Sequence, residues 1–354
     1  MKALRLKSWK SDPVLEEVPM PAPGPGEVVV QVGAAGACHS DLHLMHDFEA
    51  GVLPWGPPFT LGHENAGWVH ALGAGVRGLE LGQPVAVVGA WGCGVCRHCL
   101  DGLETYCERP DLAPVPGGGG GLGLDGGMAE YLRVPAARHL VPIPEGLDPL
   151  QAAPLTDAGL TPYHAVRRSA HKLGPTATAV VIGVGGLGHM AVQVLRATTG
   201  ARVVAVDPRD TARDLAAQYG ADLSLAPGPE LAQEIRDFTG GVGADLVIDC
   251  VGSDDTLAAA AASARQLGDI TIVGIAGGTL PVSFFGIPYE VSVQTTYWGN
   301  RRELVEVLDL ASRGLLTAET SPYTLADAAL AYRDLARGTL NGRAVVVPND
   351  SYRP

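Results

Sequence analysis

Two patterns of apolar residues divide the chain near residue 154. Before it, short apolar runs at residues 27–32, 67–72, 84–88 and 128–134 are separated by turns rich in glycine and proline. Such runs are typical of short strands joined by tight turns. The first part of the chain is therefore predicted to be a β-rich unit.

After residue 154, apolar strands alternate with segments of helical length and spacing. Strands are predicted at 180–182, 202–206, 223–225, 245–251 and 270–273, and helices at 187–198, 211–219, 229–238 and 255–266. Strands separated by helices of about ten residues indicate a parallel sheet with helices on both faces. The fold class expected is α/β, with a doubly wound parallel sheet in the second domain.

The last part of the chain resumes with a strand at 292–296, helices at 302–313 and 325–336, and a strand at 344–347. We expect this segment to return to the first domain. The expected division is thus a first domain at 1–154, a second at 155–292 and a returning segment at 293–354.

Composition limits the class of protein. A chain of 354 residues with 46% apolar and 18% charged side chains suits a globular protein of two domains. The formal charge of −13 argues against nucleic acid as a partner. No apolar run reaches membrane-spanning length and the first ten residues lack a signal-peptide core, so we expect a cytoplasmic protein without a membrane partner.

Four of the six cysteines, Cys93, Cys96, Cys99 and Cys107, lie within fifteen residues. Two overlapping CxxC steps and a fourth cysteine allow four thiolates to bind one tetrahedral zinc at about 2.3 Å. The alternative, a disulfide cluster, is disfavoured without a secretory segment. Four thiolates leave no position for a substrate, so this zinc should be structural and hold a lobe at about residues 92–110. The glycine run at 117–121 that follows is predicted to be a mobile surface linker.

A glycine-rich turn lies between the predicted strand at 180–182 and the next helix. Here the first glycine permits a tight turn, the second lets the backbone approach a pyrophosphate, and the third lets the helix pack on the strand. Asp207, at the end of the next strand, can bind both ribose hydroxyls and repels a 2′-phosphate. NAD(H) is therefore favoured over NADP(H), although Arg209 and Arg213 leave dual use open. The residues expected to bind the cofactor here are Gly183, Gly185, Gly186, Leu187, Gly188 and Asp207.

Cys38 and His63 each lie in a loop next to a predicted strand, and both residue types bind zinc. On spacing alone this is modest support for a second metal site, because a single cysteine is more often a small residue packed in the core.

These motifs occur in an order that resembles the zinc-dependent medium-chain alcohol dehydrogenases. The resemblance covers the whole chain: a GHExxG motif at residues 62–67 with a further glycine at 73, the four-cysteine lobe, then the nucleotide fingerprint. Trp55, Asp157 in its PLTDAGLTPYH segment and Tyr297-Trp298-Gly299 are most similar to bacterial secondary-alcohol dehydrogenases. The resemblance implies a GroES-like β-rich catalytic domain, a Rossmann cofactor domain, two zinc ions per subunit and a homodimer or homotetramer.

The resemblance also implies a catalytic zinc held by Cys38, His63 and Asp157, where many members have cysteine at the third position. Aspartate is an acceptable zinc ligand. Two anionic ligands would balance the charge of the dication. Glu64 is expected to tune the site or to bind the metal transiently.

The resemblance implies roles for further residues, which match the family in sequence position alone. Ser40 would receive the proton of the alcohol and His43 would pass it to solvent. His39 and Arg343 would contact the pyrophosphate, and Thr161 would support the nicotinamide carboxamide.

The expected reaction is reversible hydride transfer between a secondary alcohol or ketone, aryl-substituted ones included, and NAD⁺ or NADH. Aromatic walls suit an uncharged apolar substrate. For Phe284 and Phe285 we weigh core packing equally with substrate contact. The residues expected to contact the substrate are Phe48, Trp55, Tyr297 and Trp298.

Three alternatives stay open. Within the same superfamily the chain could be a polyol, primary-alcohol or aldehyde dehydrogenase. A zinc module that binds nucleic acid has only Arg97, His98 and Arg109 as basic residues at the lobe. A protein that binds NAD(H) without turnover would have lost its metal ligands, whereas Cys38, His63 and Asp157 are present.

Overall fold

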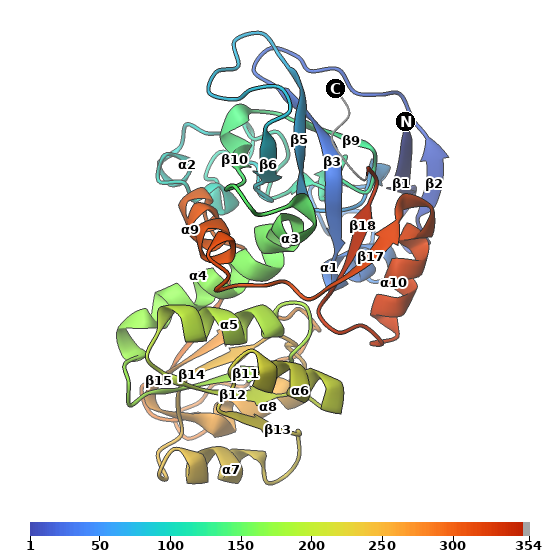
Figure 1. Ribbon diagram of the computed structural model, residues 1–354. Coiled ribbons are helices and arrows are strands. Elements are labelled where there is room, and N and C mark those ends of the chain that lie inside the picture. The colour runs from blue at the N-terminus through green and yellow to red at the C-terminus, as the bar shows by residue number, and fades with distance from the viewer. Residues whose placement is uncertain (350–354) are drawn as a thin grey trace. The chain divides into compact units, whose positions relative to one another are not determined.

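The computed structural model describes residues 1–349, which form two compact units (Figure 1). Unit 1 comprises Met1–Leu160 and the chain from Trp298 onward, and unit 2 is Thr161–Tyr297. The boundaries fall after residues 160 and 297, compared with the expected 154 and 292. The returning segment joins unit 1 because β18 (Arg343–Val347) pairs antiparallel with β3 (Val28–Ala37).

Unit 1 is built on a sheet with strand order β10-β6-β5-β3-β18-β17, in which β9 also pairs with β3. The strands not yet defined are β5 (Glu64–Leu72), β6 (Pro84–Val87), β9 (Tyr131–Val134), β10 (Leu140–Pro142) and β17 (Thr320–Thr324). Every residue of β3 is buried. A second sheet has the order β2-β1-β4, with β1 (Lys2–Leu6), β2 (Val14–Glu17) and β4 (Phe59–Thr60).

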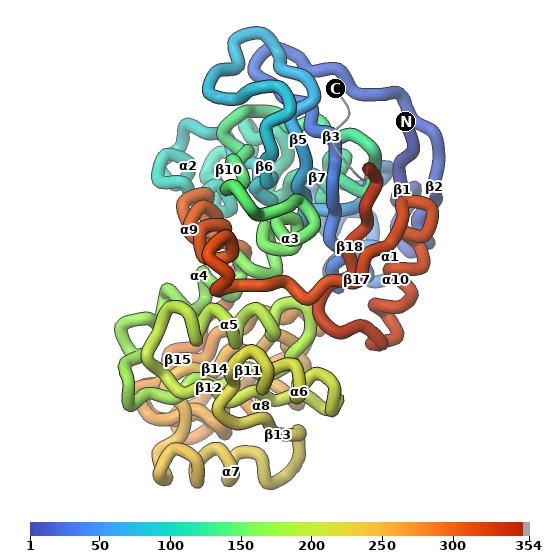
Figure 2. Tube along the Cα trace, viewed as in Figure 1, coloured from blue at the N-terminus to red at the C-terminus, as the bar shows by residue number. Residues whose placement is uncertain are grey.

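Helices of unit 1 pack on the main sheet. The short helix α3 (Pro149–Pro154) packs against β3 and β5, and α10 (Ala328–Ala336) packs against α1 (His39–His46) and β18. The returning segment also contains α9 (Arg301–Ser312), which lies against the helical turn after α3. In Figure 2 the red C-terminal trace runs through both α9 and α10.

Unit 2 is a six-stranded parallel sheet with strand order β13-β12-β11-β14-β15-β16. The strands are β11 (Thr178–Ile182), β12 (Arg202–Val206), β13 (Leu223–Leu225), β14 (Ala244–Asp249), β15 (Ala264–Ile272) and β16 (Ser292–Thr295). The strand order reverses direction at β11. Because crossovers are right-handed, the helices on the two sides of β11 cover opposite faces of the sheet.

The helices of unit 2 are α5 (Gly188–Thr198), α6 (Asp210–Gln218), α7 (Leu231–Phe238) and α8 (Asp254–Ser263), after α4 (Leu160–Ser169) at the boundary. The predicted helix at 255–266 is too long. Its alanine-rich sequence suits a helix, but Ala264 is extended and pairs with Ala244 of the sheet. Strand pairing thus overrides helix propensity there.

The glycine run at 117–121 is largely a packed element, and the prediction of a mobile surface linker was wrong. Gly118 to Gly121 are buried, and β7 (Gly119–Gly120) pairs with β8 (Gly123–Leu124). A Cβ atom on Gly119 would lie 1.9 Å from the carbonyl oxygen of Gly89. Glycine is required because backbone packs directly on backbone.

Within residues 1–349, no helix combines the length and the hydropathy needed to cross a membrane.

Candidate active site

The four cysteines of the lobe come together around α2 (Arg97–Leu100) and a 3-10 turn at Glu104–Tyr106. The sulfur atoms of Cys93, Cys96, Cys99 and Cys107 all lie within 4.8 Å of one another, and none forms a disulfide. The Sγ atoms of Cys93 and Cys99 are 3.8 Å apart. Two thiolates at about 2.3 Å from a tetrahedral zinc would be separated by about 3.8 Å. The donor set therefore fits a structural zinc.

Backbone N–H groups stabilise these thiolates. The N–H of Cys96 donates to the Cys93 sulfur at 3.3 Å, and the N–H of Glu108 donates to the Cys96 sulfur at 3.4 Å. The backbone N–H groups of Cys99 and Glu108 lower the pKa of the Cys96 thiol to about 6, although partial burial opposes this. Hydrogen bonding to the charged form prepares the sulfur to bind a metal.

A partly buried carboxylate anchors the lobe to the rest of unit 1. Glu104 accepts hydrogen bonds from the N–H of Gly92 at 2.7 Å and from Nε of Arg138 at 3.0 Å, and it lies 2.9 Å from Nε2 of His139. The ring of His139 stacks on Trp91 with centroids 5.7 Å apart. These contacts link the lobe to the main sheet, next to β10.

The basic residues of the lobe face acids. Arg97 pairs with Glu108 at 2.6 Å and Arg109 with Asp111 at 2.8 Å. Paired arginines offer little free positive charge to a phosphate backbone. This arrangement disfavours the nucleic-acid alternative.

A second group of candidate metal ligands lies inside unit 1. Cys38 follows β3 and caps α1, His63 precedes β5, and Glu64 is the first residue of β5. Asp157 lies in a π-helical turn, Leu155–Gly159, between α3 and α4. A single π-helical turn within a helix is frequently found at a functional site. The ligand atoms of all four residues lie within 4.8 Å of one another, and all four are buried.

The distances within this group suit zinc. The Asp157 Oδ2 atom lies 3.8 Å from Sγ of Cys38 and 3.6 Å from Nε2 of His63. Ligands bound at about 2.0–2.3 Å in a tetrahedron would be separated by about 3.3–3.8 Å. Sulfur, imidazole and carboxylate form a donor set that zinc accepts.

Asp41 holds the imidazole of His63, and sequence reasoning missed it. Its Oδ1 atom lies 3.2 Å from Nδ1 of His63, and both side chains are buried. Burial alone lowers the pKa of His63, but the charge of Asp41 and hydrogen bonding with Asp157, Asp41 and Cys38 raise it well above its usual value. A carboxylate behind the metal-binding histidine fixes the ring and its tautomer. The available signal was an acid three residues after Cys38.

Glu64 and Arg343 form a buried ion pair beside the metal ligands. Nε of Arg343 donates to Oε2 of Glu64 at 3.0 Å, and its Nη2 bonds the other oxygen and lies 3.7 Å from Oδ2 of Asp157. Burial raises the pKa of Glu64 to about 7 against the opposing charge of Arg343. The expected contact of Arg343 with a pyrophosphate stays a prediction; here its guanidinium binds the metal-site carboxylates.

The residues expected to move the proton lie on α1. Oγ of Ser40 is 3.3 Å from Nε2 of His63, the nitrogen that faces the metal site. His43 is partly exposed, and its Nδ1 lies 2.5 Å from Oδ2 of Asp47. His39 is exposed. Their roles in proton transfer and cofactor binding remain predictions.

Aromatic residues lie in two places in unit 1. The ring of Trp298 is buried and meets His63 edge to face at 5.9 Å. The ring centroids of Trp55 and Phe48 each lie 6.2 Å from the ring centroid of Trp9. Sequence reasoning missed Trp9, which carries no signal beyond its residue type.

The remaining aromatic candidates lie in unit 2. Tyr297 is the last residue of that unit and is exposed. Phe284 and Phe285 are 74% and 85% exposed and contact each other. The possibility that they pack in the core was wrong.

The glycine-rich turn of unit 2 connects β11 to α5. Gly183 has φ +86, and a Cβ atom on Gly188 would lie 1.8 Å from the carbonyl oxygen of Gly183. A Cβ atom on Gly185 would meet nothing within 4 Å, so the backbone there is open to a ligand. The N-terminus of α5 offers free N–H groups for an anion. The turn is therefore suited to a dinucleotide pyrophosphate.

Asp207 follows β12 and lies beside this turn. Its Oδ2 accepts from the N–H of Val184 at 2.8 Å, and its Oδ1 accepts from N and Nε of Arg209 at 3.0 and 3.2 Å. Arg213 donates to the backbone oxygen of Asp207 at 2.7 Å. The acid is thus placed where a ribose is expected in this fold. Thr161, the first residue of unit 2, is buried.

Two family models match successive parts of the chain. Residues 24–145 match the family model "Alcohol dehydrogenase GroES-like domain", and residues 186–313 match "Zinc-binding dehydrogenase". An alcohol dehydrogenase of Geobacillus stearothermophilus is 36% identical, with 98% of this chain and 99% of the relative covered. An NAD-dependent alcohol dehydrogenase of Sulfurisphaera tokodaii is 35% identical, with 98% and 100% covered.

Two solved structures are similar over nearly their full length. The alcohol dehydrogenase of the archaeon Aeropyrum pernix aligns with a TM-score of 0.90 at 34% identity, covering 98% of this chain and all of that one. Acetophenone reductase of Geotrichum candidum, in complex with NAD, aligns with a TM-score of 0.85 at 30% identity, covering 99% and 98%.

Proposed function

This chain belongs to the zinc-dependent medium-chain alcohol dehydrogenase family, and from that premise we propose that it interconverts secondary alcohols and ketones with NAD⁺ and NADH. It is an oxidoreductase that acts on an alcohol. The observation that carries the proposal is the buried group of Cys38, His63 and Asp157, whose spacing suits a zinc with one open position.

Each residue of the site then has a part. A zinc ion held by Cys38, His63 and Asp157 would lower the pKa of an alcohol hydroxyl and favour loss of its proton. The thiolate and the carboxylate balance the charge of the dication. Glu64 is paired with Arg343, whose positive charge offsets that of the Glu64 carboxylate. The pair therefore adds no further net negative charge to the site.

The proton needs a route out of the site. Ser40 offers a hydroxyl oxygen at the metal-facing nitrogen of His63. His43, paired with Asp47, is partly exposed and would pass the proton to solvent. We propose His39, Thr161 and Arg343 as further contacts of the cofactor, on register with the family.

NAD(H) is the proposed dinucleotide. The glycines from Gly183 to Gly188 suit the pyrophosphate, with Gly186 and Leu187 leading into α5, and Asp207 suits a free ribose. The arginines beside Asp207 bind its own carboxylate and backbone, which leaves less of their charge for a 2′-phosphate.

The proposed substrate is uncharged and apolar. Trp298 packs against the metal-binding His63, and Trp55, Phe48 and Trp9 form a partly buried aromatic group. Such walls suit an alkyl or aryl ketone and offer no cation for a carboxylate. The similarity to an acetophenone reductase supports an aryl-substituted substrate.

A steady-state screen tests substrate and cofactor together. Matched secondary and primary alcohols, aryl and alkyl, and a series of polyols are assayed with NAD⁺ and NADP⁺ in parallel. We expect kcat/KM for the secondary aryl alcohol with NAD⁺ to exceed that for its primary isomer about tenfold or more. Preference for polyols or primary alcohols would favour the alternative dehydrogenase activities, and NAD(H) binding without turnover would overturn the enzyme assignment.

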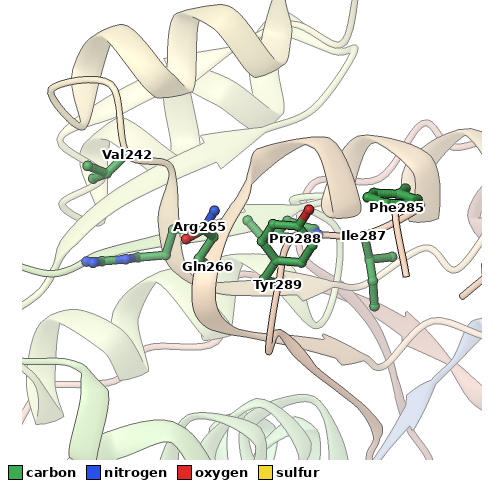
Figure 3. A pocket seen from close by; sticks show the side chains of 8 residues that line it. Val242, Arg265, Gln266, Phe285, Ile287, Pro288 and Tyr289 are labelled. Carbon is green, nitrogen blue, oxygen red and sulfur yellow. The ribbon is translucent and has the colours of Figure 1, made fainter. Parts of the chain in front are cut away.

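We also propose that the protein forms a homodimer or homotetramer. In unit 2, β16 is the last strand of its sheet and leaves one edge unpaired. Unit 2 also has a pocket of about 220 Å³ at the start of β15 and in the segment before β16, lined by Arg265, Phe285, Pro288 and Tyr289 among others (Figure 3). An open edge strand that follows a segment with exposed aromatic rings suits pairing with a second copy of the same edge.

Sedimentation of the wild type and of a Phe284→Asp/Phe285→Asp variant tests the assembly. The variant is expected to have a smaller assembly size, and an unchanged size would move the interface elsewhere. The cytoplasm remains the proposed compartment, since the lobe needs its four thiols kept reduced.

A further inference from the structure

We infer that Tyr332 is a positioning residue for the catalytic metal site, in which its phenol holds the carboxylate that orients His63. The inference rests on the proposed zinc-dependent function. It concerns a residue of α10, in the segment that returns to unit 1, and no motif of the sequence pointed to it.

The contact begins with one oxygen of Asp41. The hydroxyl of Tyr332 donates to Oδ2 of Asp41 at 3.0 Å, and the backbone N–H of Cys38 donates to the same oxygen at 3.1 Å. One donor therefore comes from a metal-binding residue and the other from the C-terminal segment. Together they fix the plane of the carboxylate.

The other oxygen of Asp41 faces the metal-binding histidine. Oδ1 lies 3.2 Å from Nδ1 of His63. Both atoms are buried, and within residues 1–349 neither has a hydrogen-bond partner, so the ion-pair contact at 3.2 Å is the polar contact that they share. The orientation of the imidazole therefore depends on where Asp41 is held.

Burial makes each of these contacts hard to replace. Asp41 is fully buried, His63 is 2% exposed and Tyr332 is 3% exposed. Burial, together with the charge of Asp41, raises the pKa of Tyr332 well above its usual value, so the phenol keeps the proton that it donates. If this hydroxyl were lost, no water would readily take its place beside the carboxylate.

The effect should reach the metal through the tautomer of His63. With Nδ1 protonated toward Asp41, Nε2 keeps its lone pair and faces the metal site, 3.6 Å from Oδ2 of Asp157. Without the phenol, Asp41 keeps one donor on Oδ2 within residues 1–349, the N–H of Cys38, and gains freedom to turn. The ring of His63 would then be less well placed to bind zinc.

The fold explains why the two residues meet although 291 positions separate them. Tyr332 lies on α10, which packs against α1, the helix that carries Asp41 (Figure 1). The C-terminal segment thereby supports both sides of the metal group, through Tyr332 behind His63 and Arg343 behind Glu64.

The chain offers a matched control for the test. Tyr323 of β17 also donates its hydroxyl to a carboxylate, Oδ2 of Asp334, at 3.0 Å. Within the described part of the chain, no hydrogen bond or ion pair joins that pair to a metal ligand. Tyr332→Phe and Tyr323→Phe each remove a single phenol oxygen from a Tyr–Asp pair, so the comparison separates loss of the buried pair beside the metal ligands from loss of a part-buried pair elsewhere in unit 1.

The experiment measures zinc retention by the holoenzyme in a chelator series, without any alcohol present. We expect Tyr332→Phe to release the catalytic zinc about tenfold more readily than the wild type. Tyr323→Phe should match the wild type, and the four-cysteine zinc should be retained equally in all three. Visible spectra of the cobalt-substituted proteins should change for Tyr332→Phe alone.

Equal zinc retention and equal cobalt spectra in the two variants would overturn the inference, even if Tyr332→Phe lowers activity. A double variant tests whether Tyr332 acts through Asp41. In an Asp41→Asn background, Tyr332→Phe should add little further loss of zinc. A full additional loss would show that Tyr332 acts without Asp41. Because no turnover is measured, failure of the substrate screen leaves this result unaffected.

Discussion

Arg343 and Glu64 form an ion pair inside unit 1 although 279 positions separate them in the chain. The two side chains are 2% and 0% exposed. Their burial beside Cys38, His63 and Asp157 makes the pair part of the metal site rather than a surface contact.

Removal of one partner of this pair should be costly. Arg343→Met leaves Glu64 buried without its cation, and we expect a loss of about 3–5 kcal/mol in the free energy of unfolding. The urea midpoint of the metal-free protein measures it. Arg133→Met, which removes an exposed partner of Glu27 at 3.6 Å, is the control and should cost about 0–1 kcal/mol. A Glu64→Gln/Arg343→Met double variant as unstable as the single would contradict the explanation.

Removal of a catalytic metal ligand should abolish turnover without unfolding the protein. In Cys38→Ser or His63→Ala, we expect kcat/KM to fall about 10³-fold or more, because the metal supplies several kcal/mol to the reaction. Zinc analysis should show one ion per subunit in place of two. Full activity with the zinc missing from that site alone would end the assignment of these ligands.

Cofactor preference should depend on Asp207. Asp207→Asn removes the negative charge but keeps the size, so kcat/KM with NADP⁺ should rise relative to NAD⁺ by about 10–100-fold. Asp237→Asn on α7 is the control, since this exposed acid contacts Gln233 and neither of the arginines beside Asp207. An unchanged ratio in Asp207→Asn would place the discrimination elsewhere.

Acid should weaken the anchor of the four-cysteine lobe. Burial alone raises the pKa of Glu104, but His139, through a hydrogen bond and its charge, and Arg138 lower it below the ordinary 4.5. A carboxyl with a lowered pKa stabilises the folded state above pH 4.5, and this is lost as the pH falls through the lowered value. Burial lowers the pKa of His139, so its protonation in acid acts in the same direction.

The variant Glu104→Gln isolates this effect. At pH 7 we expect it to be less stable than the wild type by about 1–3 kcal/mol, and the difference should shrink as the pH falls below 4.5. Urea midpoints of both proteins at several pH values measure the difference, in which protonation of the shared cysteines cancels. The same difference at every pH would contradict a role for the charge of Glu104.

Local patterns in the sequence were sufficient for much of unit 2. The strands at 202–206 and 223–225 have the predicted bounds, and the glycine turn lies between β11 and α5 as predicted. These elements form by neighbouring βαβ pairing, so the period of apolar residues and the glycines near them contain the information. The four cysteines could be identified for a similar reason, since they lie within fifteen residues of one another.

The metal group of unit 1 was harder to identify because its parts come from distant segments. Cys38, His63 and Asp157 were named through resemblance to a family, while their own spacing gave only modest support. Asp41, Tyr332 and the burial of Gly118 to Gly121 had no signal strong enough to single them out. The glycine run looked like a linker because composition does not reveal which backbone lies against it.

By itself, the sequence determined the order of elements, the α/β class, the four-cysteine lobe and the cofactor turn. The tertiary structure decided which polar groups share the interior with the metal ligands. Tyr332 and Arg343 reach that interior only because β18 adds to β3 and α10 packs on α1. A buried carboxylate must find its donors wherever the fold brings them, and contacts between segments hundreds of residues apart leave no period or spacing in the sequence.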